Sequence, residues 1–316
     1  MGSKIAVVIP CYRVASHILE VVRGIGPEVS RIYIVDDACP EQTGALVKES
    51  LSDYRVTVLS HESNQGVGAA VVTGYKRAMA DGADIVVKLD GDGQMDPRLI
   101  SQLVAPILAG NADYTKGNRF AALAGLRAMP NIRVLGNGGL SLLTKGSTGY
   151  WNITDPTNGF TAIHKTALAA LPLEMLSKRF FFESDLLFRL SLVKAVVWDV
   201  PMQARYGQEK SNLNVLKTLF EFAWKHTVNF HKRFFYNYYL REMSAASIEL
   251  PLGVLSLWFG VIFGVTAWAG SVNSGIPATA GTVMLSGLPI ILGVQLILAF
   301  INFDVAQVPK HPIQAR

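Results

Sequence analysis

Cysteine is scarce in this chain, which holds Cys11 and Cys39 among its 316 residues. Two cysteines exclude a disulfide framework and a structural zinc site, and they favour a reduced, cytosolic setting. A secretory leader is not expected either, because the apolar run after Lys4 extends only over Ile5–Ile9 before Pro10 interrupts it. This short run instead predicts a buried strand.

Charge is also low, with 17% charged residues against 50% hydrophobic ones. Soluble domains carry about 25% charged residues, so the apolar excess must be concentrated somewhere. It lies near the C-terminus, where Leu250–Ala269 and Gly281–Phe303 hold no charged residue. Each run has the ~20 apolar residues that a membrane-crossing helix needs. The sequence therefore predicts two spans, at about 250–269 and 281–303.

The link between these runs, 270–280, has neither lysine nor arginine, whereas both outer flanks are basic. The flanking residues are Lys232, Arg233 and Arg241 before the first run and Lys310 and Arg316 after the second. Because basic flanks stay on the cytosolic side, we expect a two-span inner-membrane protein with its catalytic part and both termini in the cytosol. Such hairpins can also pack together, so a homo-oligomer is possible.

The segment 213–243 interleaves aromatic and basic residues, which is typical of helices that lie in the lipid interface. An ordinary packed helix pair is the alternative. No nucleic-acid module accompanies the basic residues, so nucleic acid is not an expected partner. The expected organisation is a catalytic domain over 1–212, amphipathic juxtamembrane helices over 213–243, and a two-span anchor with a short tail over 244–316.

The N-terminal part alternates short apolar runs with segments of helical spacing. The predicted strands are Ile5–Ile9, Ile32–Val35, Val56–Leu59 and Ile85–Leu89, and the predicted helices are Ser16–Ile25, Glu41–Leu51 and Val67–Ala80. Strands that are apolar on both faces and separated by helices predict an α/β fold with a mostly parallel, Rossmann-like sheet. Ligands of such sheets bind at the carboxyl ends of the strands.

Two acids and an amide follow the fourth predicted strand in the sequence DGDGQ, 90–94. The oxygens of Asp90, Asp92 and Gln94 suit a hard divalent cation, Mg²⁺ or Mn²⁺, whose remaining ligands would be phosphates. A calcium EF-hand loop is excluded because its required glycine and final glutamate are missing. A plain acidic turn is the remaining alternative. We predict that these three residues bind the metal.

Two weaker motifs follow the second and third predicted strands. Asp36 and Asp37 could accept hydrogen bonds from a base or a ribose, although aspartate caps helices as often. The turn 64–68, NQGVG, opens a helix whose backbone N–H groups could face a pyrophosphate, or it simply starts that helix. It matches neither a Walker loop nor a dinucleotide fingerprint.

Together these motifs resemble family 2 glycosyltransferases of the GT-A fold, and more closely the polyprenyl-phosphate glycosyltransferases of the dolichol-phosphate-mannose-synthase type. The resemblance covers residues 4–212, and the two-helix tail is similar to bacterial members anchored by a helix hairpin. The matching segments are VIPCY (8–12), VDD (35–37), LDGDGQ (89–94), GNRF (117–120), DPTNGF (155–160), FESD (182–185) and RYGQEK (205–210).

The resemblance implies a set of donor-binding residues. Those expected around the nucleotide sugar are Pro10, Tyr12, Asp37, Gln65, Asp90 and Asp155. Asp90, Asp92 and Gln94 would hold the metal that bridges the diphosphate. Val14 and the segment Ala38–Pro40 depart from the pattern of mannosyl-type members, which leaves the choice between a UDP- and a GDP-linked sugar open.

The resemblance also implies acceptor and catalytic residues. Arg119 and Arg133 would meet the acceptor phosphate, with structural ion pairs as their alternative role. Asp155 and Asp185 would line the sugar pocket. The expected catalytic residues are Asp92 and Asp185 together with Arg205 and Lys210, which would close over the diphosphate from a mobile loop.

The expected function is metal-dependent, inverting transfer of a hexose from a nucleotide sugar to polyprenyl phosphate (undecaprenyl or dolichyl phosphate) at the cytosolic membrane face. A phosphate acceptor, with its second pKa near ~6, is already anionic and needs positioning, not a strong base. The alternative is transfer to a lipid-linked saccharide or cell-envelope glycan, for which Asp185 or Glu183 would have to act as base. A catalytically inactive scaffold is disfavoured by the intact acid pair.

Replacing the second acid of the predicted metal site separates an enzyme from a scaffold. We expect Asp92→Ala to abolish sugar transfer, because a departing diphosphate needs its charge neutralised. Transfer of radiolabelled sugar is the measurement. A variant that retained full turnover would contradict the predicted metal site.

Overall fold

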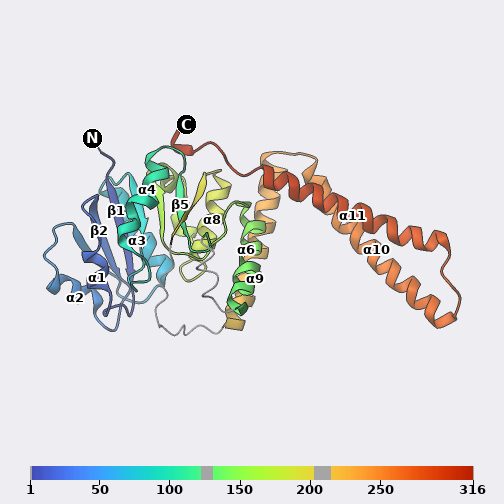
Figure 1. Cartoon of the computed structure of the whole chain (residues 1–316), viewed down its shortest axis with the longest axis horizontal. Helices are drawn as coiled ribbons and strands as arrows, with labels where there is room; N and C mark the ends of the chain where they lie inside the picture. The colour runs from blue at the N-terminus through green and yellow to red at the C-terminus, as the bar shows by residue number, and fades with distance from the viewer. Residues whose placement is uncertain (1, 122–130, 203–214, 316) are drawn as a thin grey trace. The chain divides into compact units, whose positions relative to one another are not determined.

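The computed structural model describes residues 2–121, 131–202 and 215–315. The chain divides into two compact units (Figure 1). Unit 1 comprises Met1–Phe230 and Pro309–Arg316, and unit 2 comprises His231–Val308. The tail after the second apolar helix thus groups with unit 1, whereas the sequence-based boundaries assigned it to the anchor.

Unit 1 is built on a seven-stranded sheet with the order β3-β2-β1-β4-β6-β5-β7. The strands are β1 (Ile5–Cys11), β2 (Val29–Asp36), β3 (Val56–Ser60), β4 (Ile85–Lys88), β5 (Tyr114–Asn118), β6 (Thr161–His164) and β7 (Val197–Pro201). β6 runs antiparallel to its neighbours β4 and β5, and every other pairing is parallel. The expected mostly parallel α/β sheet is confirmed.

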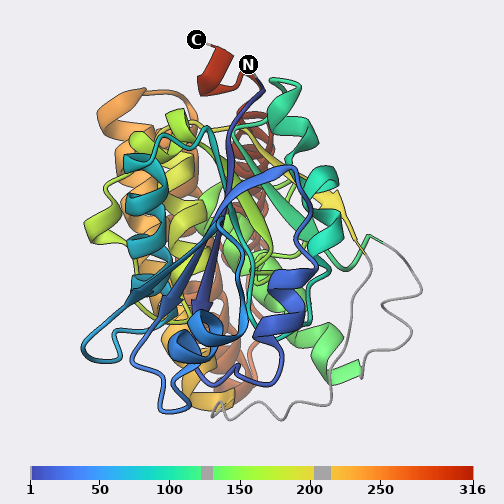
Figure 2. The ribbon, with the colours of Figure 1, turned by 90° about the vertical axis from the view of Figure 1, so that its left-hand side faces the viewer.

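Helices cover both faces of this sheet (Figure 2). The helices up to residue 235 are α1 (Ile18–Arg23), α2 (Thr43–Ser50), α3 (Val67–Ala80), α4 (Ile100–Leu108), α6 (Asn131–Thr148), α7 (Lys165–Ala169), α8 (Phe182–Leu192) and α9 (Val215–Phe235). Of these, α3 and α8 pack on one face of the sheet and α1, α2 and α4 on the other. Alternate strand residues enter separate cores: Val8 and Tyr33 pack with Tyr75 of α3, while Ile9 and Ile34 pack with residues of α1 and α4. The strands are therefore apolar on both sides.

All four predicted strands and all three predicted helices form near their expected positions. β2 begins at Val29, three residues before the predicted start at Ile32. The prediction began late because Ser30 and Arg31, which are exposed, interrupt the apolar run. The parallel strands β1 to β4 end at one edge of the sheet, and the antiparallel β6 starts at that edge. The segments 155–160 and 89–94 are thereby brought to the same side.

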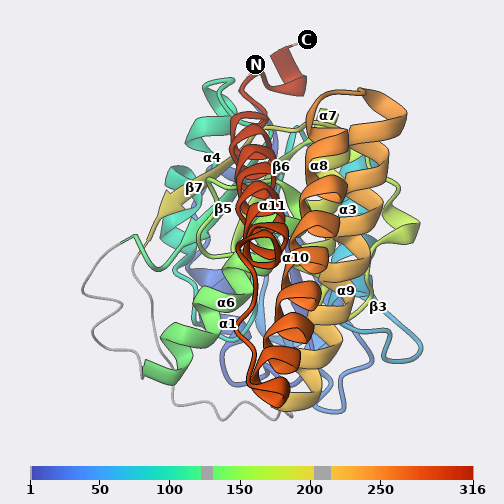
Figure 3. The ribbon, with the colours of Figure 1, turned by 90° about the vertical axis from the view of Figure 1, so that its right-hand side faces the viewer.

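Unit 2 contains two long apolar helices that lie side by side, α10 (Ala246–Ser274) and α11 (Ala280–Ala306) (Figures 1 and 3). Both are long and apolar enough to cross a membrane. Gly253 and Gly293 face each other where they touch, since a Cβ on Gly293 would lie 2.8 Å from the Gly253 carbonyl oxygen. Small residues that allow such close backbone contact are typical of helix pairs in membranes.

An ion pair is buried inside unit 2 near the end of α11. Arg233 donates to both carboxylate oxygens of Asp304 at 2.7 and 2.9 Å, and the Tyr238 hydroxyl donates to the same carboxylate at 2.6 Å. All three side chains are at most 4% exposed. Arg233, counted above as a free basic flank, is therefore neutralised within the fold.

The C-terminal tail is attached to unit 1 through Asp113, which is fully buried. Its carboxylate accepts hydrogen bonds from the backbone N–H groups of Val196, Ile313 and Gln314 at 2.8 to 3.0 Å. The Gln314 side chain donates to two further carbonyls, and Ile313 packs against the core. The chain thus leaves unit 1 before the apolar hairpin and returns to it afterwards.

Removing this carboxylate is expected to release the tail. Asp113→Ala deprives three backbone N–H groups of their acceptor, at a cost of about 1–3 kcal/mol for each group left buried. Trypsin should then cut after the exposed Lys310 at least about tenfold faster, given RT ln 10 near 1.4 kcal/mol. Mass spectrometry of the 311–316 peptide measures this.

The matched control is Asp84→Ala, which removes an acid that binds Lys4 and Lys165 elsewhere on unit 1. Equal cleavage of the two variants would show that Asp113 does not hold the tail.

Candidate active site

The predicted metal-binding turn follows β4 at the carboxyl edge of the sheet. Asp90, Asp92 and Gln94 are all partly exposed, and the Gln94 backbone N–H donates to Asp92 Oδ1 at 3.0 Å. Among the residues that the structure describes, no group of three or more His, Cys, Asp or Glu side chains is placed to hold a metal ion. A cation here would rely on two carboxylates, an amide and oxygens of its ligand.

A buried lysine stands directly behind this turn. Lys88 Nζ lies 2.7 Å from Asp90 Oδ1 and 3.0 Å from Glu183 Oε1, and its side chain is 1% exposed. Burial opposes the charged form, but the two carboxylates outweigh it and raise the pKa of Lys88 above its ordinary value. The ammonium therefore stays charged and joins β4 to the first turn of α8.

Gly159 completes this arrangement from the segment before β6. A Cβ at this position would lie 2.5 Å from Asp90 Oδ2 and would also collide with Lys88 Nζ. Real Cβ atoms do not approach other atoms so closely. The glycine therefore allows 155–160 to pack closely on the acidic turn, and a side chain there would displace the ends of Lys88 and Asp90.

Asp37, predicted on the nucleotide side, organises the loops around it. Its carboxylate accepts hydrogen bonds from the backbone N–H groups of Gln65 and Gly66 at 2.8 Å each. His61 Nδ1 lies 2.7 Å from Asp37 Oδ1, and His61 Nε2 lies 2.9 Å from the Thr73 hydroxyl. Asp37 is 2% exposed, so it shapes the turn that precedes α3 from within the protein.

The loops after β1 and β2 are held in unusual backbone conformations. Arg13 and Ala38 have φ angles of 56° and 52°, in the left-handed region. The Arg13 backbone N–H donates to Cys39 Sγ at 3.0 Å, which ties the loop after β1 to the loop after β2. Pro10 is buried on β1, and Tyr12 is exposed at the edge. Strained backbone of this kind is concentrated at binding sites.

Asp155 and Arg119, predicted for the sugar and the acceptor, form an ion pair. Arg119 Nε and Nη2 donate to the two Asp155 oxygens at 2.7 and 2.9 Å. Asp155 is fully buried, whereas the Arg119 side chain is 30% exposed. The structural role left open for Arg119 is thus present, and its side chain remains partly exposed.

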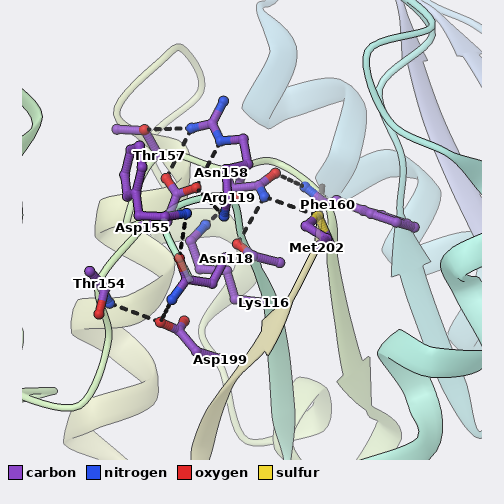
Figure 4. A network of polar contacts seen from close by, with 12 residues as sticks. Lys116, Asn118, Arg119, Thr154, Asp155, Thr157, Asn158, Phe160, Asp199 and Met202 are labelled. Atoms are coloured by element: carbon purple, nitrogen blue, oxygen red, sulfur yellow. Dashed lines mark hydrogen bonds and ion pairs between the residues drawn. The ribbon is translucent and has the colours of Figure 1, made fainter. Parts of the chain in front are cut away.

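Two residues of β5, Lys116 and Asn118, help to hold the segment 154–160 in place (Figure 4). Lys116 donates to the Asn158 carbonyl, and Asn118 donates to Asp199, which also accepts from the Thr154 N–H. Burial lowers the pKa of Lys116 to about 8 and raises that of Asp199 to about 6. The loop beside Asp155 is therefore held in place before any ligand binds.

Asp185, predicted in the sugar pocket, faces a different direction from Glu183. Its carboxylate accepts from the Ser177 N–H at 2.8 Å and pairs with Arg189 on its own helix at 3.4 Å. Glu183 faces Lys88 and the acidic turn instead. Of the two acids in the FESD segment, Glu183 thus belongs to the cluster around Asp90.

Three predicted residues cannot be placed. Arg205 and Lys210 lie outside the described residues, and Arg133 falls on α6, where its side chain is outside the described part. Their roles remain predictions. Lys88, Lys116 and His61 were not predicted from the sequence. Lys88 could have been, because it is a lysine at the end of the apolar run of β4.

Comparison with known proteins places this arrangement among glycosyltransferases. The sequence profile named "Glycosyl transferase family 2" matches residues 6–171. UDP-N-acetylglucosamine–dolichyl-phosphate N-acetylglucosaminyltransferase of Methanococcus voltae is 32% identical over 218 residues, covering 65% of this chain and 86% of that one. Polyprenol monophosphomannose synthase of Mycolicibacterium smegmatis is 30% identical, covering 69% and 84%.

Solved structures show the same fold. Glucosyl-3-phosphoglycerate synthase from Mycobacterium tuberculosis, in complex with Mn²⁺, UDP and glucosyl-3-phosphoglycerate, superposes with a TM-score of 0.53 at 21% identity. The match covers 73% of this chain and 80% of that one. The GT-A-like fold expected from the sequence is confirmed.

Adding one methyl group at Gly159 is expected to disturb the acidic turn. Gly159→Ala forces Asp90 and Lys88 apart, and a displacement of about 1 Å in a reacting site can reduce the rate by roughly 10²-fold. Steady-state kcat/KM for sugar transfer is the measurement. Gly139→Ala, on an exposed position of α6 with open space around it, is the matched control. Equal activity of both variants would argue against a role of this turn in transfer.

Proposed function

We propose a reaction for this chain from the premise that it belongs to glycosyl transferase family 2 and is a glycosyltransferase. It transfers a hexose, with inversion, from a UDP- or GDP-linked sugar to polyprenyl phosphate at the cytosolic face of a membrane. One observation carries the proposal: the chain of the unit that holds the acidic site continues into two apolar helices long enough to cross a membrane and returns to the same unit after them.

The donor site is supported by the charges at the carboxyl edge. Asp90, Asp92 and Gln94 offer hard oxygen ligands, and the structure leaves all three partly exposed, so they fit Mg²⁺ or Mn²⁺. Such a cation neutralises the departing diphosphate. Asp37 and His61 shape the turn before α3, whose backbone would face the nucleotide.

The partners of Asp185 and Glu183 favour a phosphate acceptor over a sugar hydroxyl. A sugar hydroxyl would need a carboxylate as general base. Asp185 is bound to Ser177 and Arg189, and Glu183 is paired with the buried ammonium of Lys88. An anionic phosphate needs no such base. One relative is named as an N-acetylglucosaminyltransferase to dolichyl phosphate, and another as a polyprenol monophosphomannose synthase.

Contact with lipid is supported by two helices of unit 1 whose polar side faces inward. On α6, Ser147 is buried while Leu142 is 63% exposed, and on α9, His226 is buried while Phe220 and Trp224 are 75% and 69% exposed. Ser147 Oγ and His226 Nδ1 lie 2.8 Å apart between the helices. Apolar residues outside and polar ones inside are expected where lipid covers the surface.

The attachment of the tail supports the proposed membrane orientation. Ile313 and Gln314 are bound to Asp113 of unit 1, so α11 must end on the side where unit 1 lies. An even number of crossings satisfies this condition, in agreement with the two candidate spans. Together with the basic flanks, this supports a cytosolic catalytic domain and cytosolic termini. Self-association of the hairpins stays a prediction.

A donor panel tests the reaction. The full-length protein in detergent is incubated with radiolabelled UDP- and GDP-sugars, short-chain polyprenyl phosphate and Mg²⁺ or Mn²⁺. We expect metal-dependent label in the organic phase with one of these donors, and none with Asp92→Ala. Asp53→Ala, which alters an ion pair with Arg55 before β3, should retain activity.

Two outcomes would contradict the proposal. Label that enters only a lipid-linked saccharide or glycan would indicate the alternative acceptor class. Transfer that persists at full rate in the presence of a chelator would remove the cation from the mechanism.

A further inference from the structure

Lys88 is a buried charge to which the proposed reaction assigns no role. It ends β4, a central strand whose preceding residues Ile85–Val87 are all apolar and buried. Replacing a buried ion pair by apolar residues of similar size is often neutral or stabilising. Fold stability alone therefore does not require a lysine at this position, and its contacts must be considered.

The ammonium connects two segments that are distant in the sequence. Asp90 lies in the turn after β4, and Glu183 lies in the first turn of α8, at 2.7 and 3.0 Å from Lys88 Nζ. Gly159 packs against Lys88 and Asp90 from a third segment. The Asp90 side chain is thus held on two sides while it remains 29% exposed.

We infer that Lys88 is a positioning residue that holds the Asp90 carboxylate in the orientation that binds the divalent cation and donor diphosphate. Glu183 is the second support of the ammonium. The inference rests on the proposed function, because the cation and the donor belong to it. Residues that orient a metal ligand through a hydrogen bond typically change metal affinity by about 10- to 100-fold when they are replaced.

Two effects of Lys88 on a cation would have opposite signs. Repulsion between the ammonium and the cation would weaken binding, whereas fixing the carboxylate of Asp90 would strengthen it. Two carboxylates already neutralise the ammonium, so its field at the cation is reduced. We therefore expect positioning to dominate, and the sign of the change on removing the lysine distinguishes the two effects.

The test measures binding, not turnover. Isothermal titration of the full-length protein in detergent with Mn²⁺ together with UDP or GDP gives the affinity, and the electron paramagnetic resonance spectrum of bound Mn²⁺ reports its ligands. Lys88→Met, which keeps the length of the side chain, should weaken binding by about 10- to 100-fold and alter the spectrum. Glu183→Gln should weaken it by a smaller factor.

Arg55→Met is the matched control, because it removes a partly buried ion pair at the amino end of β3. It should lower the unfolding temperature and leave the affinity for Mn²⁺ and nucleotide unchanged. In an Asp90→Asn background, Lys88→Met should weaken binding by less than about twofold, since the lysine acts through that carboxylate. If Lys88→Met does not fold, Glu183→Gln, which removes one of the two carboxylates that hold the ammonium, carries the same comparison.

The outcomes separate the inference from the function on which it rests. Equal or tighter binding by Lys88→Met, or a full effect in the Asp90→Asn background, would overturn the positioning role and leave the proposed function standing. A wild-type protein that binds neither nucleotide with Mn²⁺ would overturn both.

Discussion

The direction of the strands is the constraint on which the site depends. β1, β2, β3 and β4 run parallel, so their carboxyl ends meet at one edge, and each end carries a polar loop. β6 runs the other way, which brings Gly159 and Asp155 to the same edge from the start of a strand. Residues far apart in the sequence become neighbours because of this topology alone.

Two buried lysines, Lys88 and Lys116, position the polar groups at that edge. Lys88 and Lys116 are both buried beneath acids and carbonyls, and the environments of the two ammonium groups differ. Lys88 has two carboxylates within 3.0 Å, whereas Lys116 donates to the Asn158 carbonyl and its pKa falls to about 8 through burial. The two lysines bind the carboxylates of Asp90 and Glu183 and the carbonyl of Asn158, in place of water. The loops of the site are therefore held in position before a ligand binds.

Buried polar contacts also hold unit 2 and the C-terminal tail. Unit 2 holds its helix pair together with small residues and buries the Arg233–Asp304 pair near the end of α11. In unit 1, Asp113 binds the returning tail through backbone N–H groups of Ile313 and Gln314. The Gln314 side chain and Ile313 add contacts of their own, and all of these join the tail to residues about 200 positions earlier, so composition could not indicate the attachment.

The sequence by itself determined the alternation of strands and helices, the two apolar helices and the acidic turn 90–94, because periodicity and charge are local properties of the chain. It also indicated the family through the order of its motifs. Only the tertiary structure decided that Glu183 and not Asp185 joins Asp90, that Arg119 is paired with Asp155, and that the tail returns to Asp113. Those partners come from separate segments, and the contacts between them exist only once the strand order has placed those segments side by side.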